Sequence, residues 1–168
     1  MHAMDATTLD ALALFPRQLE AHYRAIPTGF EHWAPASWDG IPSEPFTAIE
    51  QVCHVRDVEI DGYHARFQRT LHEPDPLLPG LPVALAVERD YAHANVADAL
   101  ARFAAARAGT ITLLSGLSAE QLARTAVFED YGPVTLHSLA HYLCSHDQQH
   151  LAGLQWLLGK IAATRAAI

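Results

Sequence analysis

Two pairs of histidines near the end of the chain have the spacing that places two imidazoles on one face of a helix. His137 and His141 form the first pair, and His146 and His150 form the second. Side chains four residues apart stack on the same helical face, where they can share a metal ion. Histidine is also the commonest metal ligand in proteins. The spacing therefore predicts metal chemistry, provided that one pair faces the interior of the protein.

The helix expected over about Leu136–Ile161 separates the two pairs. At about 100° per residue its leucines form an apolar stripe, and His146 and His150 fall at the edge of that stripe. His137 and His141 fall on the polar side. We therefore expect the second pair to point into the protein and the first to face solvent or a partner. Inward imidazoles need a metal ion or hydrogen bonds to offset the cost of desolvation.

A metal site inside a helical bundle needs ligands from more than one helix. The helical segment expected over about Phe46–Leu71 offers His54 and His64. His54 lies on a secondary apolar face beside Val55 and Val58. His64 belongs to a stronger apolar stripe, which contains Phe46, Ile49, Val52, Ile60, Tyr63 and Phe67. Periodicity alone thus favours His64 as the inward histidine of this segment.

Several other polar residues lie close to these histidines in the sequence. Asp147 falls inside the apolar stripe, so its carboxylate needs a partner. It could orient a metal-binding imidazole by a hydrogen bond without binding the metal itself, or it could form a buried salt bridge with an arginine, and we favour the salt bridge. We expect Asp57 and Glu59 on a solvated helix face. Cys53 and Cys144 are too few for a disulfide framework and are expected to be packing residues.

Helical periodicity and proline positions indicate how these residues are held. Apolar residues recur with helical spacing in four segments, at about 7–25, 46–71, 96–114 and 136–161. Pro16 should kink or divide the first, Asn95 and Thr135 should cap the third and fourth, and Ser118 and Gln121 should start a short helical turn. Eight of the ten prolines fall in two connecting stretches, and strand alternation is absent. We predict one all-α domain over residues 1–168, a four-helix bundle with long proline-rich connecting loops.

Composition excludes several classes of protein. The chain has 168 residues, half of them hydrophobic, which suits one domain with a packed core and excludes general disorder. The net charge of −8 argues against binding to nucleic acid. No apolar run is long enough for a membrane span, and no secretory signal opens the sequence, so we expect a cytoplasmic protein. Five further histidines have no spacing that suggests a metal site, and we expect them at the surface or in loops: His2, His22, His32, His72 and His93.

Two segments resemble the DinB-like (YfiT-like) family of metal-dependent enzymes. The run from Thr135 to Leu151 is similar to the C-terminal signature of that family, and the run from Phe46 to His54 is similar to its first ligand helix. The resemblance covers most of the chain. It implies a four-helix bundle, often a homodimer, in which His54, His146 and His150 bind a divalent metal ion. It thereby favours His54 over His64.

A site of three histidines implies particular chemistry. Three neutral imidazoles leave one coordination position open on zinc or nickel, which is the pattern of catalytic sites. Some members of the wider family resemble transferases or isomerases that use a low-molecular-weight thiol. We therefore expect a metal-dependent transferase or hydrolase that acts on a small molecule, with thiol S-transfer as the leading reaction. The alternative is a non-catalytic bundle that binds metal or dimerises.

Overall fold

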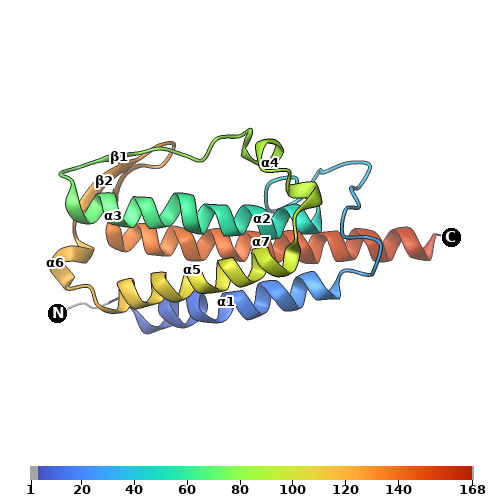
Figure 1. The fold of residues 1–168 in the computed structure, drawn as a ribbon, viewed down its shortest axis with the longest axis horizontal. Helices are drawn as coiled ribbons and strands as arrows, with labels where there is room; N and C mark the ends of the chain where they lie inside the picture. The colour runs from blue at the N-terminus through green and yellow to red at the C-terminus, as the bar shows by residue number, and fades with distance from the viewer. Residues whose placement is uncertain (1–3, 168) are drawn as a thin grey trace.

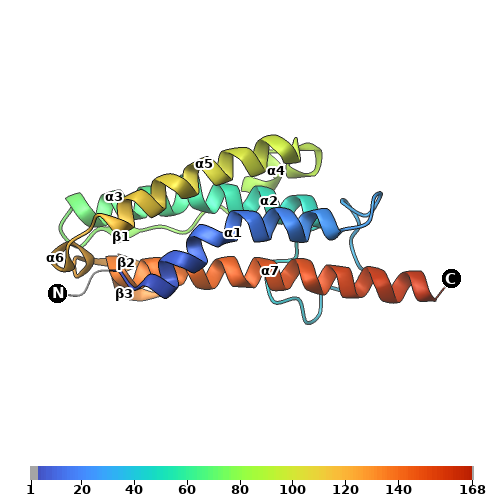
Figure 2. The same ribbon diagram turned by 90° about the horizontal axis from the view of Figure 1, so that it is seen from below.

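Four long helical segments run side by side along the molecule, as two perpendicular views show (Figures 1 and 2). The computed structural model describes residues 4–167. Three segments are single helices and the fourth is composite: α1 (Ala6–Ala25), α5 (Val96–Ser115), α7 (Leu136–Ala166), and the continuous run of α2 (Ala48–Asp57), the π-helix η1 (Val58–Tyr63) and α3 (His64–His72). The predicted four-helix bundle is confirmed.

The helix starts follow from short-range capping. The Asn95 side chain accepts a hydrogen bond from the Asp98 amide at the start of α5, and Thr135 forms a capping box with Ser138 at the start of α7. Ser118 likewise caps the short helix α6 (Ala119–Leu122). Pro16 lies inside α1 without dividing it, although α1 changes direction partway along its length (Figure 2).

A small three-stranded sheet at one end of the bundle makes the all-α prediction wrong in this detail (Figure 1). β1 (Leu77–Leu78) runs parallel to β2 (Thr125–Phe128), which pairs antiparallel with β3 (Gly132–Thr135). The strands have two to four residues, too few to show alternation in the sequence. Asp130 and Gly132 turn the β2–β3 hairpin with positive φ angles of 66° and 81°.

The two proline-rich stretches differ in structure. Residues 26–47 connect α1 to α2 without a helix or strand. Residues 73–95 instead contain β1, the short helix α4 (Leu85–Glu88) and the 3-10 helix η2 (Tyr91–His93). The first stretch packs against α7, where the Trp38 and Trp156 rings stack with centroids 6.1 Å apart. Gly153 permits this approach, because a Cβ atom there would collide with the Ser43 hydroxyl.

Two clusters of buried apolar side chains fill the bundle. One surrounds Leu136, Leu139 and Leu143 toward the sheet, and the other surrounds Leu154 and Ile161 toward the far end of α7. Burial of such side chains stabilises a fold by about 1.5–3 kcal/mol each. Within residues 4–167, none of the helices combines the length and the apolar composition that a bilayer-spanning segment needs.

Between these clusters lies a buried ionic network centred on Arg107 of α5. Its guanidinium donates hydrogen bonds to Glu59 of η1 at 2.9 and 3.1 Å and to Asp147 of α7 at 2.7 and 3.0 Å. It also donates to the Leu12 carbonyl of α1 at 3.0 Å, and the Thr110 hydroxyl donates to Glu59. One side chain therefore links all four helical segments. Asp147 thus forms the buried salt bridge that the sequence analysis favoured.

Removal of Arg107 should destabilise the bundle strongly. Arg107→Ala leaves two carboxylates buried without a counter-charge, so we expect the free energy of unfolding to fall by about 3–5 kcal/mol. Urea denaturation followed by circular dichroism measures this loss. The control is Arg102→Ala on the exposed face of the same helix, which should change stability by less than about 0.5 kcal/mol. Equal losses in the two variants would contradict the assignment.

Candidate metal centre

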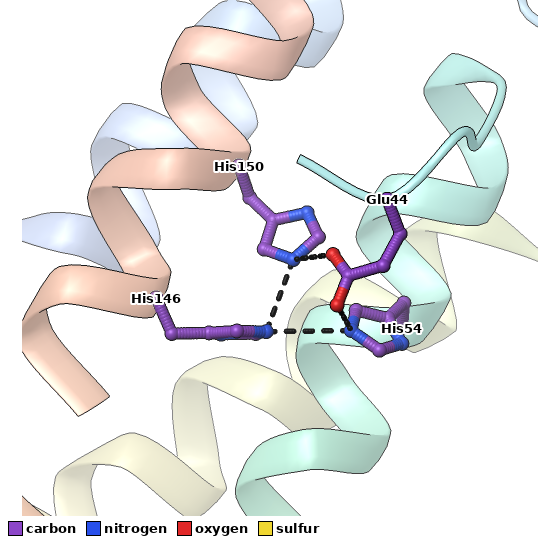
Figure 3. A group of neighbouring side chains, drawn as sticks. All are labelled: Glu44, His54, His146 and His150. Atoms are coloured by element: carbon purple, nitrogen blue, oxygen red, sulfur yellow. Dashed lines mark hydrogen bonds and ion pairs between the residues drawn. The ribbon is translucent and has the colours of Figure 1, made fainter. Parts of the chain in front are cut away.

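Three imidazole nitrogens from two helices converge at one point in the bundle (Figure 3). The Nε2 atom of His146 lies 3.3 Å from Nε2 of His54 and 3.0 Å from Nε2 of His150. His54 belongs to α2, whereas His146 and His150 occupy successive turns of α7. Neutral imidazoles that present their Nε2 atoms to a common point form a donor set that suits zinc, nickel or similar divalent ions. The residues present therefore fit such an ion.

Glu44 brings a carboxylate to the same point from the stretch between α1 and α2 (Figure 3). Its Oε2 atom lies 3.2 Å from Nε2 of His150, and its Oε1 atom lies 3.5 Å from Nε2 of His54. The ligand atoms of these four side chains all lie within 4.8 Å of one another. Glu44 was missed in the sequence because it lies in a non-periodic stretch.

Gln51 fixes the orientation of His150. The amide nitrogen of Gln51 donates to the Ser43 hydroxyl at 2.9 Å and to the Phe46 carbonyl at 3.2 Å, so its Oε1 atom is left to accept. His150 directs its Nδ1 atom at that oxygen. Donation from Nδ1 leaves the lone pair of His150 on Nε2, which faces the other histidines. Partners of this kind orient metal-binding imidazoles and raise their basicity.

Burial keeps the two α7 imidazoles in their neutral form. It lowers the pKa of His146 well below the ordinary histidine value and also lowers the pKa of His150. The adjacent imidazoles act in the same direction on His146. Nδ1 of His146 is buried and has no hydrogen-bond partner within residues 4–167. Because metal ions bind neutral imidazole, the site is prepared for a cation without first losing protons at neutral pH.

His64 lies outside this cluster, which corrects the inference drawn from periodicity. Its Nε2 atom is 3.1 Å from the Ala106 carbonyl and 3.0 Å from the Thr110 hydroxyl on α5. The physical reason is η1, in which hydrogen bonds join residues five apart. Such residues would lie about 140° apart around a regular α-helix. A helical wheel that uses a constant 100° per residue therefore assigns His54 and His64 to the wrong relative faces, because η1 lies between them.

Asp57 and Glu59 are also placed differently from the prediction of a solvated face. Both carboxylates are buried. Asp57 accepts hydrogen bonds from the Arg56 guanidinium at 2.7 Å and the Tyr91 hydroxyl at 2.6 Å, and Glu59 is paired with Arg107. The burial of these carboxylates could not be predicted, because the residues that pair with Glu59 and Asp57 include Arg107 and Tyr91, which are distant in the sequence.

The outward histidine pair lies at the surface near the start of α1. The Nε2 atoms of His137 and His141 are 3.8 and 3.6 Å from Oδ2 of Asp5, so these three residues form a second group of possible ligands. Cys53 is buried and Cys144 is half-buried, and both are free thiols. His2, which was expected at the surface, lies outside the described residues.

Two small cavities adjoin the cluster, each of about 190 Å³. The first is mostly apolar and lies between Glu44, His54 and the segment from Leu81 to Ala86. The second is lined by His54 and His146 and also by Arg66 of α3. Both volumes suit a small molecule or part of one, and neither suits a polymer.

Comparison with known proteins places the chain in a family. The sequence profile of the DinB superfamily matches residues 11–154. The chain belongs to the DinB superfamily. The comparison with curated proteins gives no match.

Among solved structures, this DinB-superfamily chain is similar to YfiT from Bacillus subtilis. The TM-score is 0.80 at 22% sequence identity, over 93% of this chain and 86% of the YfiT chain. At that identity the likeness shows a common fold. YfiT is described as a probable metal-dependent hydrolase with an unusual four-helix bundle topology.

The role of Gln51 can be measured through metal affinity. Gln51→Leu removes the acceptor of His150 Nδ1, and loss of such a partner weakens metal binding by about 10–100-fold. Competition with a chromophoric zinc chelator gives the dissociation constant. The control is Gln68→Leu on the exposed side of α3, which should retain wild-type affinity. An unchanged affinity in Gln51→Leu would show that Gln51 does not support the site.

Proposed function

We propose that this DinB-superfamily protein is a metal-dependent enzyme that acts on a small molecule. His54, His146 and His150 would hold one divalent ion, zinc or nickel. The observation that carries the proposal is the convergence of three Nε2 atoms beside a carboxylate and two small cavities. Structural zinc sites usually have four protein ligands, often cysteines, whereas three histidines are typical of catalytic sites.

The bound ion and Glu44 would have complementary roles. A divalent ion with an exchangeable position lowers the pKa of a water or thiol ligand and so supplies a nucleophile at neutral pH. Glu44 is a half-exposed carboxylate and is ionised at neutral pH. Its carboxylate faces the three imidazoles, within 3.2 and 3.5 Å of two of them. It is therefore positioned to accept the proton of the nucleophile as a general base.

We further propose transfer of a low-molecular-weight thiol to a small electrophile as the reaction. The sulfur–carbon bond forms as the bond to the leaving group breaks, the thiol proton passes to Glu44, and the leaving group departs with its electron pair. Apolar residues around the first cavity, among them Phe46, Leu81 and Leu85, would exclude water from the reacting atoms. Exclusion of water favours attack by sulfur over hydrolysis.

Hydrolysis is the second candidate reaction, and the description of YfiT as a probable metal-dependent hydrolase favours it. In that case Glu44 would accept a proton from water in place of a thiol. A non-catalytic metal-binding or dimerising bundle is the remaining alternative. Family resemblance also supports a homodimer, which we retain as a proposal.

The general-base role of Glu44 separates the catalytic proposals from the non-catalytic one. Glu44→Gln keeps the shape of the side chain but cannot accept the proton, so turnover should fall by about 10²–10⁴-fold. Zinc stoichiometry should remain that of the wild type, because the three histidines are intact. The measurement is metal-dependent conjugation of a small thiol to a chloro-aromatic electrophile, run beside a panel of hydrolase substrates.

The matched control is Glu50→Gln in the first turn of α2, since Glu50 forms the capping box of α2 and lies outside the four-residue cluster. It should retain activity. If Glu44→Gln lost its zinc and its activity together, Glu44 would be a ligand and not a base. If zinc-loaded wild-type protein turned over neither thiols nor hydrolase substrates, the proposed enzyme function would be rejected.

A further inference from the structure

Arg66 of α3 is a buried cation that has no carboxylate partner in the part of the chain that the structure describes. Its exposed fraction is 6%, and its Nε atom has no hydrogen-bond partner within residues 4–167. One contact is made by Nη2, which donates to the Pro79 carbonyl at 3.2 Å. Burial lowers the pKa of Arg66. A buried charge without a counter-charge is costly, so such a group needs a reason to be retained.

The lack of a partner is specific to Arg66 among the well-buried arginines. Arg107 is paired with Glu59 and Asp147, and Arg56 is paired with Asp57. Two more exposed arginines are paired as well, since Arg69 binds Glu73 and Arg89 binds Asp61. The fold thus supplies acidic partners to Arg56, Arg69, Arg89 and Arg107 and leaves Arg66, which is also well buried, with unused donors.

The guanidinium of Arg66 is held in place rather than extended into solvent. Its Cζ atom lies 4.4 Å from the centroid of the Phe128 ring and 4.9 Å from that of Tyr63. Gly62 leaves room for it, because a Cβ atom there would lie 2.9 Å from Nη1. Arginine side chains usually extend their charged ends into water. Here the guanidinium instead lies inside, against the rings of Phe128 and Tyr63.

The cavity that Arg66 borders also reaches the proposed metal centre. It has a volume of about 190 Å³ and is lined by Arg66, His54, His146 and Glu44. His54 and Arg66 are twelve residues apart and would lie about 120° apart on a regular α-helix. The π-helix η1 between them changes the phase, so that one helical segment presents both side chains to one cavity.

We propose that Arg66 binds a carboxylate group of the small-molecule substrate while the reacting atom of that molecule lies at His54, His146 and His150. This inference rests on the proposed function and names its substrate class, a small organic acid or a thiol that carries a carboxylate. Arginine is suited to carboxylates because its planar donors match their geometry. One guanidinium, in a cavity that also contains the Glu44 carboxylate, suits a single negative charge better than a phosphate dianion.

The first test needs no metal. Metal-free protein is titrated with propionate, and the NMR signal of the Arg66 Nε–H group, assigned by its loss in Arg66→Met, is followed. We expect a saturable shift with propionate and none with propionamide, its neutral analogue. Arg69→Met, a neighbouring arginine already paired with Glu73, should retain the shift. Absence of a saturable shift, or an equal shift with propionamide, would overturn the inference.

The second test measures thiol preference in cobalt-loaded protein, where thiolate ligation gives an absorption band. Wild-type protein should bind 3-mercaptopropionate at least about tenfold more tightly than 2-mercaptoethanol, because only the acidic thiol can form charge-assisted hydrogen bonds with Arg66. Arg66→Met should remove the preference and leave the affinity for 2-mercaptoethanol unchanged. If Arg66→Met does not fold, Gly62→Ala displaces the guanidinium without removing its charge and should also reduce the preference.

The two tests distinguish failure of this inference from failure of the proposed function. Cobalt binding without a preference for the acidic thiol would reject the role of Arg66 but would still support the proposed metal centre. Failure of cobalt to bind would reject the metal centre, while the propionate titration would still decide whether Arg66 binds a carboxylate.

Discussion

The buried guanidinium of Arg107 is the interaction on which the arrangement of this bundle depends. It joins α1, η1, α5 and α7 through contacts with Leu12, Glu59 and Asp147. Asp147 directly follows His146, so the network that holds the helices together also fixes the turn of α7 that carries the proposed metal ligands. Two carboxylates and one guanidinium can be buried only as a set. The polar centre therefore restricts how the helices can slide or rotate relative to each other.

Much of the fold could be predicted because its signals are local. Asn95 and Thr135 cap α5 and α7 as expected, since capping depends on residues only three positions away. The sheet could not be predicted, because its parallel pair joins Leu77 to Val127 across fifty residues and its strands are very short. The π-helix was also missed. A π-helix has no characteristic amino-acid composition, so it is recognised only by its hydrogen-bond pattern in the structure.

Some residues of the candidate site could also be predicted from local sequence patterns, and others could not. His146 and His150 were separated from the outward pair by helical periodicity alone, and the structure brings them together. His54 was favoured by family resemblance, against a periodicity that η1 had shifted. Glu44 and Gln51 had no sequence signal. Glu44 reaches the site from a stretch without secondary structure, and Gln51 acts through a contact with a residue 99 positions away.

The most direct test of this account is the zinc stoichiometry of untagged protein, compared between two variants of the same helical segment. The account predicts one tightly bound zinc per chain in the wild type and in His64→Ala, and its loss in His54→Ala without loss of helical circular dichroism. His54 faces the two α7 histidines, whereas His64 faces α5. Retention of tight zinc in His54→Ala, or its loss in both variants, would contradict the central claim that His54, His146 and His150 form one metal centre.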